Sequence, residues 1–355
     1  MATSTKEATA EGHKVTTVVS SNDATAGAPA EPAAGDQQQL KALGWCFRED
    51  GLLCSVASGE PYTVDAFTEG GGDYEQLAST ITQTVVSFLG TEAWGRMQRQ
   101  IFAVPAKTGE NSGEDPYAQP GTKYGFFKTD GKGSKKLLIL VPGIGARAGV
   151  WGRSLCATSG LEHGSFAPFI RAGLQQGAQV VALDPNAGVD AFDGEASVRA
   201  TVLAWRELIR SAVEGDGQTE VFVVAHSFGG ASLIDALADT ASRSPEALAC
   251  IRGVAFTDSV HHVEPGCIQL STKKKEKFPE AAAKVLQETA VLYLADGDIE
   301  VGTEIDAFND TRGCRTVSAG TDDHTDTNLM SLPCILKQFG WDAGDAGTAR
   351  EGCQA

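Results

Sequence analysis

The stretch that most constrains this chain is Glu220–Gly230, where an apolar run ends at a serine with two glycines close behind it. Val221 to Val224 are four consecutive apolar residues, which predicts a short strand buried on both faces. Beyond the glycines, Ala231–Leu237 has the composition of a helix. Ser227 is therefore expected at a sharp corner between a buried strand and a helix.

A serine at such a corner has a specific chemical use. The turn lifts its hydroxyl above the sheet and points the N-terminus of the new helix at it, which is the nucleophile position of an α/β-hydrolase. Small residues must flank the turn, and Ala225 and Gly229 stand two positions before and after Ser227. The alternative is an ordinary strand, turn and helix with a buried capping serine.

Strand and helix patterns alternate on both sides of Ser227. The expected strands are Lys136–Val141, Gln179–Leu183, Val221–Val224, Gly253–Phe256, Val291–Leu294 and Arg315–Ser318. The expected helices are Tyr74–Phe88, Phe166–Leu174, 198–209, Leu233–Leu237, Ala281–Leu286 and Leu329–Phe339. This alternation predicts an α/β fold of the α/β-hydrolase type, a mostly parallel sheet with helices on both faces.

One domain is expected over residues 39–341, opening with a small hairpin and helix extension. Residues 1–38 are rich in small and polar residues, and such a segment buries too little apolar surface to offset its ordering entropy. We therefore expect a disordered tail there and a second one over 342–355. Lys107–Thr122 is expected to be a surface loop.

The formal net charge of −17 limits what the chain can bind directly. An acidic surface repels phosphate backbones, so any contact with RNA is expected to be indirect. The basic run Lys273–Lys277 is interpreted as a solvated loop or, alternatively, as a nuclear-import signal. The chain lacks the apolar run of a secretory signal or a membrane span, and its eight cysteines form no C-x-x-C pair. We expect a soluble intracellular protein with reduced thiols and no membrane association.

The partners of a nucleophilic serine are expected at the carboxyl ends of the other strands, in the order acid and then histidine. His324 follows the last strand and satisfies that order. For the acid, Asp298 after the penultimate strand is preferred, and Asp258 after the strand next to the elbow is the alternative. Asp296 is a third candidate for the acid and is less favoured than the other two.

Backbone N–H groups are expected to stabilise an oxyanion. The glycines of the loop after the first strand would let the amides of Gly143, Ile144 and Gly145 approach, together with the Phe228 N–H. The alternative is a plain glycine turn. This loop lacks the Lys-Ser/Thr of a phosphate-binding loop, so no nucleotide cofactor is expected.

A metal site is not expected either. His261, His262, Glu264 and Cys267 stand close together in the sequence. Neighbouring strand residues point to opposite faces, however, and the spacing fits no common zinc pattern. His226, beside the candidate nucleophile, is expected to pack against a neighbouring strand.

Five segments together carry a family resemblance: Leu138–Trp151, Val180–Asn186, Val223–Gly230, Ala255–His261 and Val317–His324. In order and spacing they resemble the Argonaute-binding protein 2 domain family, and further matches near residues 44–47 and 59–62 extend the resemblance over residues 39–341. It implies an α/β-hydrolase-like fold used in nuclear RNA biology. The family includes a subunit of a fungal Argonaute chaperone complex, animal cotranscriptional regulators and the C-terminal domain of some fungal histone deacetylases.

Carried onto this chain, the family's nucleophile position falls on Ser227 and its final Thr-Asp-x-His on Thr321–His324. Animal members tend to have His-Gly-Ser-Gly where this chain has Pro142–Gly145. An oxyanion hole of backbone amides survives that change. The chain also lacks the long basic insert of the animal members, so no RNA-binding or import role of that insert carries over to it.

The resemblance implies an adaptor that binds Argonaute, chromatin or splicing partners in the nucleus and cytoplasm, linked to small-RNA-mediated heterochromatin formation and cotranscriptional regulation. The alternative is an active serine hydrolase, an esterase or thioesterase, in which Ser227 attacks, His324 is the base and Asp298 or Asp258 orients it. A direct small-RNA binder is a third class, which the net charge of −17 disfavours.

Overall fold

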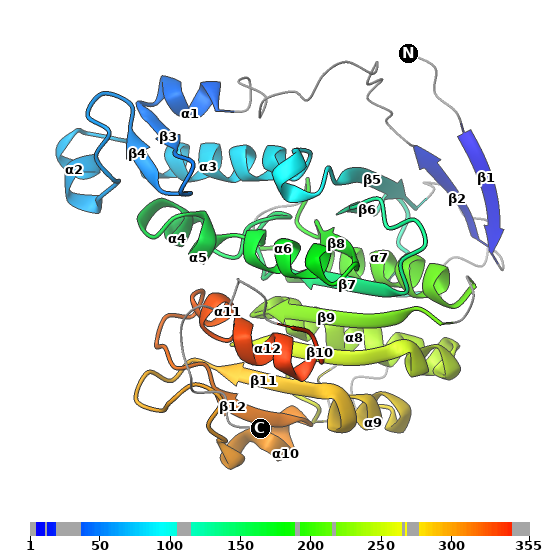
Figure 1. Cartoon of the computed structure of the whole chain (residues 1–355). Coiled ribbons are helices and arrows are strands. Elements are labelled where there is room, and N and C mark those ends of the chain that lie inside the picture. The colour runs from blue at the N-terminus through cyan, green and yellow to red at the C-terminus, as the bar shows by residue number, and fades with distance from the viewer. Residues whose placement is uncertain are drawn as a thin grey trace.

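Ten strands form one continuous sheet in the computed structural model, in the order β1-β2-β5-β6-β8-β7-β9-β10-β11-β12 (Figure 1). The structure describes residues 5–10, 13–18, 37–104, 115–188, 192–214, 218–264, 267 and 277–342. A separate small hairpin joins β3 to β4 near the start of the chain.

The parallel strands are β8 (Gln179–Leu183), β7 (Lys136–Val141), β9 (Glu220–His226), β10 (Ile251–Thr257), β11 (Ala290–Leu294) and β12 (Arg315–Ser318). Beyond β8 the sheet continues antiparallel through β6 (Lys123–Lys128), β5 (Gln98–Ala103), β2 (His13–Val18) and β1 (Thr5–Ala10). Because the parallel strands share one direction, their carboxyl ends meet at one edge of the sheet. The predicted α/β-hydrolase-like architecture is confirmed.

The antiparallel strands were not predicted, and two of them lie inside the expected N-terminal tail. β5 mixes exposed, half-buried and buried residues without a regular period, so it has no continuous apolar run to reveal it. β2 is paired to β5 through residues 16–18 and β1 is paired to β2. Backbone hydrogen bonds therefore hold β1 and β2 in the sheet, although the composition of this segment predicts disorder. The rest of that tail, residues 343–355, 105–114 and most of Lys273–Lys277 lie outside the described residues.

Helices cover both faces of the sheet (Figure 1). One face packs against α7 (Gly194–Glu214), α8 (Phe228–Arg243) and α9 (Glu280–Thr289). The other packs against α3 (Tyr74–Phe88), α6 (Ala167–Gln175) and α12 (Leu332–Gln338). Alternate residues of the central strands enter the two cores, since successive strand side chains point to opposite faces: Leu138, for example, faces α6 and Ile139 faces α7.

The remaining elements are short. They are α1 (Gln38–Ala42), β3 (Trp45–Phe47), β4 (Leu53–Ser55), α2 (Val64–Glu69), α4 (Arg153–Thr158), α5 (Leu161–Gly164), α10 (Asn309–Arg312) and α11 (Thr327–Met330). Together α1, β3, β4 and α2 form the expected hairpin and helix extension at one end of the molecule (Figure 1). The predicted closing helix is divided at Ser331 into α11 and α12.

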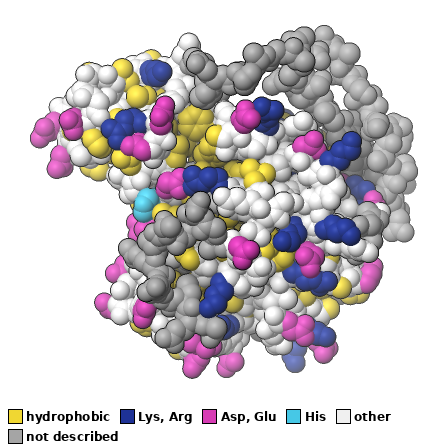
Figure 2. All heavy atoms as spheres, in the orientation of Figure 1, with side chains coloured by type: hydrophobic (Ala, Val, Ile, Leu, Met, Phe, Trp, Pro, Cys, Tyr) yellow, Lys and Arg dark blue, Asp and Glu magenta, His cyan; other side chains and the backbone are white. Residues whose placement is uncertain are grey.

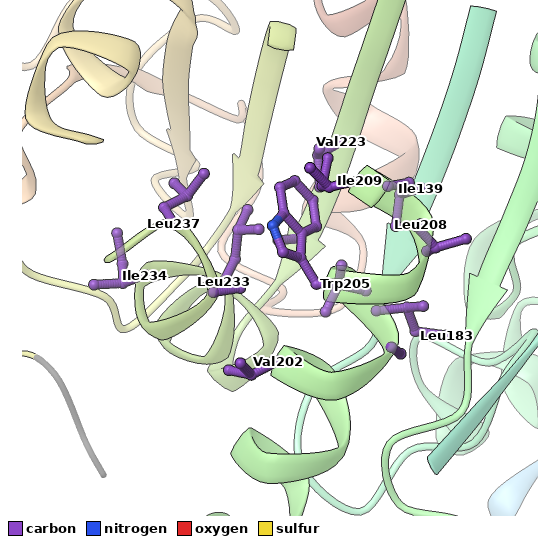
Figure 3. Close-up of a cluster of buried hydrophobic side chains, with 14 of the residues drawn as sticks. Ile139, Leu183, Val202, Trp205, Leu208, Ile209, Val223, Leu233, Ile234 and Leu237 are labelled. Carbon is purple, nitrogen blue, oxygen red and sulfur yellow. The ribbon is translucent and has the colours of Figure 1, made fainter. Parts of the chain in front are cut away.

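Trp205 is the largest fully buried side chain and joins α7 to α8 and the sheet (Figure 3). Its indole Nε1–H donates to Thr240 Oγ1 over 3.0 Å, so the buried polar atom of the ring has a partner. The elbow helix α8 is thereby fixed against α7, and Ser227 stands at the start of a helix with little freedom to move.

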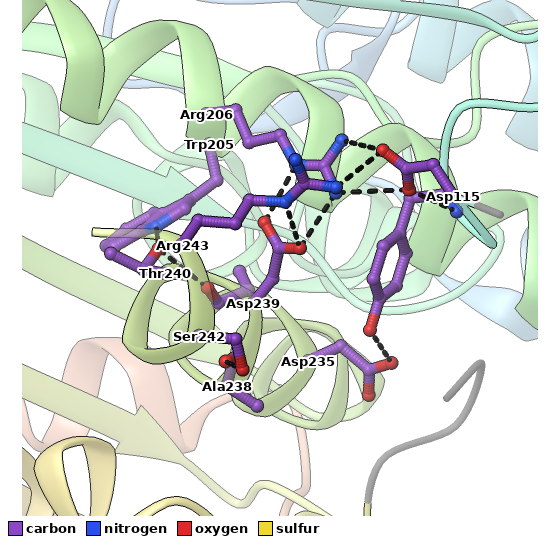
Figure 4. Close-up of polar contacts among 11 residues, drawn as sticks. Asp115, Trp205, Arg206, Asp235, Ala238, Asp239, Thr240, Ser242 and Arg243 are labelled. Carbon is purple, nitrogen blue, oxygen red and sulfur yellow. Dashed lines mark hydrogen bonds and ion pairs between the residues drawn. The ribbon is translucent and has the colours of Figure 1, made fainter. Parts of the chain in front are cut away.

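A charged cluster lies at the outer side of the same two helices (Figure 4). Arg206 of α7 bridges two carboxylates, Asp115 at 2.8 Å and Asp239 at 2.7 Å. Arg243 of α8 contacts the same two carboxylates from a half-exposed position. The cluster ties residue 115, which precedes β6, to the elbow helix.

The chemistry of the remaining surface is mixed. Acidic and basic side chains are interspersed on the face shown in Figure 2. No helix among the described residues is long and apolar enough to cross a bilayer.

Of the described cysteines, Cys334 is disulfide-bonded, contrary to the expectation of reduced thiols throughout, whereas Cys46, Cys54, Cys156, Cys250 and Cys314 are free.

Candidate active site

Ser227 occupies a strained corner between β9 and α8. Its φ of 54° and ψ of −126° lie in a region that non-glycine residues rarely adopt. The two following glycines are required by packing. A Cβ on Gly229 would come within 2.5 Å of the Pro142 carbonyl oxygen, and one on Gly230 within 1.9 Å of Ser259 Oγ. The local geometry is therefore that of a nucleophile elbow.

The histidine and its acid come from two other strand ends. His324 follows β12, and its Nδ1–H donates to Asp258 Oδ2 over 2.5 Å. Asp258 follows β10 and also has a positive φ, 41°. Its other oxygen accepts the Ala295 N–H at 3.1 Å, so both carboxylate oxygens are held. This arrangement fixes the imidazole with Nε2 free to accept a proton.

The pKa of Asp258 reflects these bonds. Burial raises it, but the hydrogen bonds from His324 and from the Ala295 N–H lower it further, so the carboxyl titrates below its usual range. Asp258 is thus ionised at neutral pH, as an orienting acid must be.

The structure pairs His324 with Asp258 and not with Asp298, the acid that the sequence analysis preferred. Asp298 is exposed in the loop after β11, and its own N–H donates to Asp296 Oδ1. The neighbouring Gly297 N–H donates to Asp322 Oδ1, which folds this loop onto the loop that carries His324 without bringing Asp298 to the imidazole. Asp258 follows directly on the strand that neighbours β9, and its positive φ turns the carboxylate toward His324.

His226, at the end of β9, contacts the end of β10 and the segment that follows β12. Its Nδ1–H donates to the Thr257 carbonyl oxygen at 2.9 Å, and Thr257 Oγ1 donates to Asn328 Oδ1 at 2.7 Å. The His226 ring centroid is 4.6 Å from that of His324, which places the base beside the elbow. Asn328 was missed by sequence reasoning, because a single buried asparagine after the last strand carries no recognisable pattern.

Ser227 and His324 share no hydrogen bond in this structure. Among the described residues Ser227 Oγ makes no hydrogen bond, and the His324 ring bonds only to Asp258. The imidazole is half exposed and Ser227 is partly exposed, so the gap faces solvent. Catalytic hydrogen bonds are often long in free enzymes and tighten when substrate binds.

The glycine loop after β7 lies against the nucleophile. A Cβ on Gly143 would stand 3.2 Å from Ser227 Cβ and 3.6 Å from Ser227 Oγ, so the absence of a side chain opens this approach. Phe228 is the first residue of α8, where a backbone N–H has no partner inside its helix. Gly145, with a φ of 75°, is exposed at the tip of the loop.

Among the residues considered for a metal, His261 has other partners, whereas the buried Nδ1 of His262 has no hydrogen-bond partner among the described residues. His261 Nε2–H donates to the Arg312 carbonyl oxygen at 3.2 Å, and its Nδ1 accepts from Ser259 Oγ at 2.9 Å. In the described part of the chain no three His, Cys, Asp or Glu side chains gather as a metal site would require.

The two buried histidines predict an acid-sensitive fold. Burial lowers the pKa of His226 and of His261 to about 3, whereas an exposed histidine titrates near 6.5. The unfolded chain therefore binds more protons as pH falls below 6.5, so stability is complete above that pH and is lost below it. The loss is about 2 kcal/mol for each histidine at pH 5.

Urea unfolding at pH 7.5 and pH 5 would measure this loss. His261→Gln keeps a polar side chain but cannot titrate, so the fall in stability between the two pH values should shrink by about half. An unchanged fall in the variant would show that His261 is not the source.

A strained serine at a strand-to-helix corner, a histidine paired to an aspartate and an adjoining glycine loop define the class of α/β-hydrolases. A family profile described as "Alpha/beta hydrolase family" matches residues 138–343. The chain belongs to that family.

More specific similarity extends beyond the matched region. Cotranscriptional regulator ARB2A of Mus musculus is 23% identical over 368 residues, covering 87% of this chain and 82% of that protein. A FAM172 family protein homolog of Caenorhabditis elegans is 30% identical over 193 residues, covering 54% and 57%. Among solved structures, dienelactone hydrolase from Anabaena variabilis aligns with a TM-score of 0.30 and 14% identity over 56% of this chain and 74% of that one. The similarity to ARB2A confirms the family resemblance drawn from the sequence.

Proposed function

We propose that Ser227, His324 and Asp258 form a serine hydrolase site that cleaves a carboxylic ester or thioester, in a protein whose cellular role is cotranscriptional regulation. The observation that carries the chemical part is the His324–Asp258 hydrogen bond of 2.5 Å formed beside a strained Ser227. Both non-glycine residues that hold positive φ at this edge, Ser227 and Asp258, have a role in the mechanism. Such strain is typical of functional sites.

The reaction follows from the positions of the side chains. Ser227 Oγ attacks the carbonyl carbon while its proton passes to His324 Nε2, and the new imidazolium is stabilised by Asp258. Backbone N–H groups of the 143–145 loop and of Phe228 donate hydrogen bonds to the carbonyl oxygen as it becomes negatively charged. His324 then gives its proton to the departing alcohol or thiol, leaving an acyl group on Ser227. Water, activated by the same histidine, releases the acid and restores the serine.

Labelling with a fluorophosphonate tests this site, because the reagent reacts with a serine whose base and oxyanion donors are assembled. We expect the wild-type chain to be labelled at one residue and Ser227→Ala and His324→Ala to be unlabelled. Ser242→Ala, which changes a serine of α8 away from the sheet edge, is the matched control and should be labelled normally. A folded wild-type protein that resists the reagent would refute the hydrolase.

The regulatory role is favoured by similarity to proteins named cotranscriptional regulators over 87% of this chain. We extend it to a protein of the nucleus, with a cytoplasmic pool, that binds Argonaute, chromatin or splicing partners and acts in small-RNA-mediated heterochromatin formation. With a net charge of −17, contact with RNA would be made through the partner.

Co-purification of the tagged chain with Argonaute from its own cells tests this extension. We expect recovery to survive ribonuclease treatment and to be the same for Ser227→Ala, since a protein interface need not use the nucleophile. Recovery that disappears with ribonuclease would show that RNA bridges the two proteins. Exclusion of a fluorescent fusion from the nucleus would refute the nuclear role.

A further inference from the structure

We propose that Asn186 is a positioning residue that orients the oxyanion hole and selects the Ile144 N–H as its second donor, beside the Phe228 N–H. The proposal deepens the hydrolase function proposed above and rests on it. Asn186 lies in the segment that follows β8, next to the loop that follows β7, and is 5% exposed.

Asn186 uses both hydrogens of its amide on the glycine loop. Its Nδ2 donates to the Gly143 carbonyl oxygen at 3.0 Å and to the Ala146 carbonyl oxygen at 2.6 Å. The loop is therefore held from one side at two carbonyl groups, by a side chain that is itself buried.

Asp184 holds the end of the same loop. Its two carboxylate oxygens accept from Arg147 Nε and Nη2 at 2.7 and 2.8 Å, and one of them also accepts the Ala148 N–H at 3.1 Å. A bidentate arginine pair with a buried carboxylate is a rigid contact. Residues 184–186 thus form a clamp on the loop from Gly143 to Ala148.

The clamp decides where the amides of the loop point. In a trans peptide the carbonyl and the next N–H point in opposite directions, so turning the Gly143 carbonyl toward Asn186 turns the Ile144 N–H away from it. Among the hydrogen bonds of the described residues, none uses the Ile144 N–H. Ser227 lies against Gly143, and its Oγ is 3.6 Å from the position that a Cβ on Gly143 would occupy. An unused donor therefore belongs to the residue that follows the one lying against the nucleophile, where a donor to an oxyanion is required.

The requirement for asparagine follows from the two acceptors. Two carbonyl oxygens need two N–H donors at one position, and only a primary amide of this length supplies them. Aspartate has the same shape but would place a carboxylate oxygen against both carbonyls. Asn186→Asp therefore changes the contact from attraction to repulsion with almost no change in volume.

The test compares Asn186→Asp with the wild-type chain in fluorophosphonate labelling. We expect the maximal labelling rate to fall about 10² to 10³-fold, the effect of losing one oxyanion donor, while the probe concentration for half-maximal rate changes less than about twofold. Asn309→Asp is the matched control. Asn309 is the first residue of α10, and its Oδ1 accepts the Thr316 N–H, a contact that an aspartate oxygen keeps.

Amide hydrogen exchange over residues 143–148 separates this proposal from the hydrolase. We expect faster exchange there in Asn186→Asp than in the control, whether or not the wild type is labelled. An unlabelled wild type with that exchange pattern would refute the hydrolase and keep the clamp. The clamp would be refuted if Asn186→Asp matched the wild type in both its labelling rate and its hydrogen exchange. If Asn186→Asp fails to fold, Asn186→Ala, which removes the donors without adding charge, is held to the same two measurements.

Discussion

Asp258→Asn is expected to lower the rate of fluorophosphonate labelling about 10³ to 10⁴-fold, because an amide can favour the imidazole tautomer in which Nε2 carries the proton. His324 would then be unable to accept the proton of Ser227. The change conserves volume and keeps the side chain able to accept the Ala295 N–H. Loss of labelling should therefore occur without unfolding, which circular dichroism would check.

Asp298→Asn is the matched control for that experiment. It removes the same charge from a neighbouring loop at the same edge of the sheet, but from an exposed side chain outside the His324 contact. Labelling within about twofold of the wild type is expected, since an exposed charge is well screened. If Asp298→Asn were the variant that lost labelling, the assignment of Asp258 would be wrong.

Arg206→Met is expected to reduce the free energy of unfolding by about 3–5 kcal/mol, the cost of leaving buried carboxylates without their cation. Asp115 and Asp239 are 10% and 7% exposed and both bond to Arg206 (Figure 4). Burial raises the pKa of Asp115, and the hydrogen bond and charge of the Arg206 guanidinium lower it below its usual range, so removing the arginine takes away the contact that stabilises this buried carboxylate. Methionine replaces most of the volume, which limits the effect to charge and hydrogen bonding.

Arg243→Met provides the comparison within the same cluster. Arg243 contacts the same carboxylates but is 50% exposed, and such a partner contributes about 1 kcal/mol or less. Urea unfolding of the two variants at pH 7 should therefore give clearly unequal losses. Equal losses would show that burial does not set the importance of the two arginines.

Most of the parallel part of the sheet was predictable because nearly all its strands contain continuous apolar runs, β12 being the exception. Lys136–Val141 and Arg315–Ser318 were predicted with the bounds that the structure shows, and so was the helix Tyr74–Phe88. The antiparallel strands were not, because β5 shows mixed exposure and β1 and β2 belong to a polar segment held by backbone pairing. Periodicity reports burial, and β5 buries few of its residues, whereas β6 is mostly buried but was not predicted either.

The site was predictable in its chemistry and only partly in its geometry. Ser227 and His324 could be proposed from the sequence because each follows a predicted strand and the two stand in the required chain order. The choice between Asp258 and Asp298 depended on a positive φ and on which loop folds inward, and the sequence encodes neither as a pattern. Asn186 and Asn328 were missed for the same reason, since a single buried amide is recognised only by the carbonyls around it.

The position of the acid has an evolutionary consequence. Because the carboxylate that pairs with His324 comes from the strand beside the elbow, the loop after β11 supplies no side chain to that pair and contributes only the Ala295 N–H. Substitutions at its exposed positions Asp298 and Glu300 would accumulate there without disturbing the pair. A lineage could therefore acquire new surface features at the rim of an ancient catalytic centre while the centre itself stays intact.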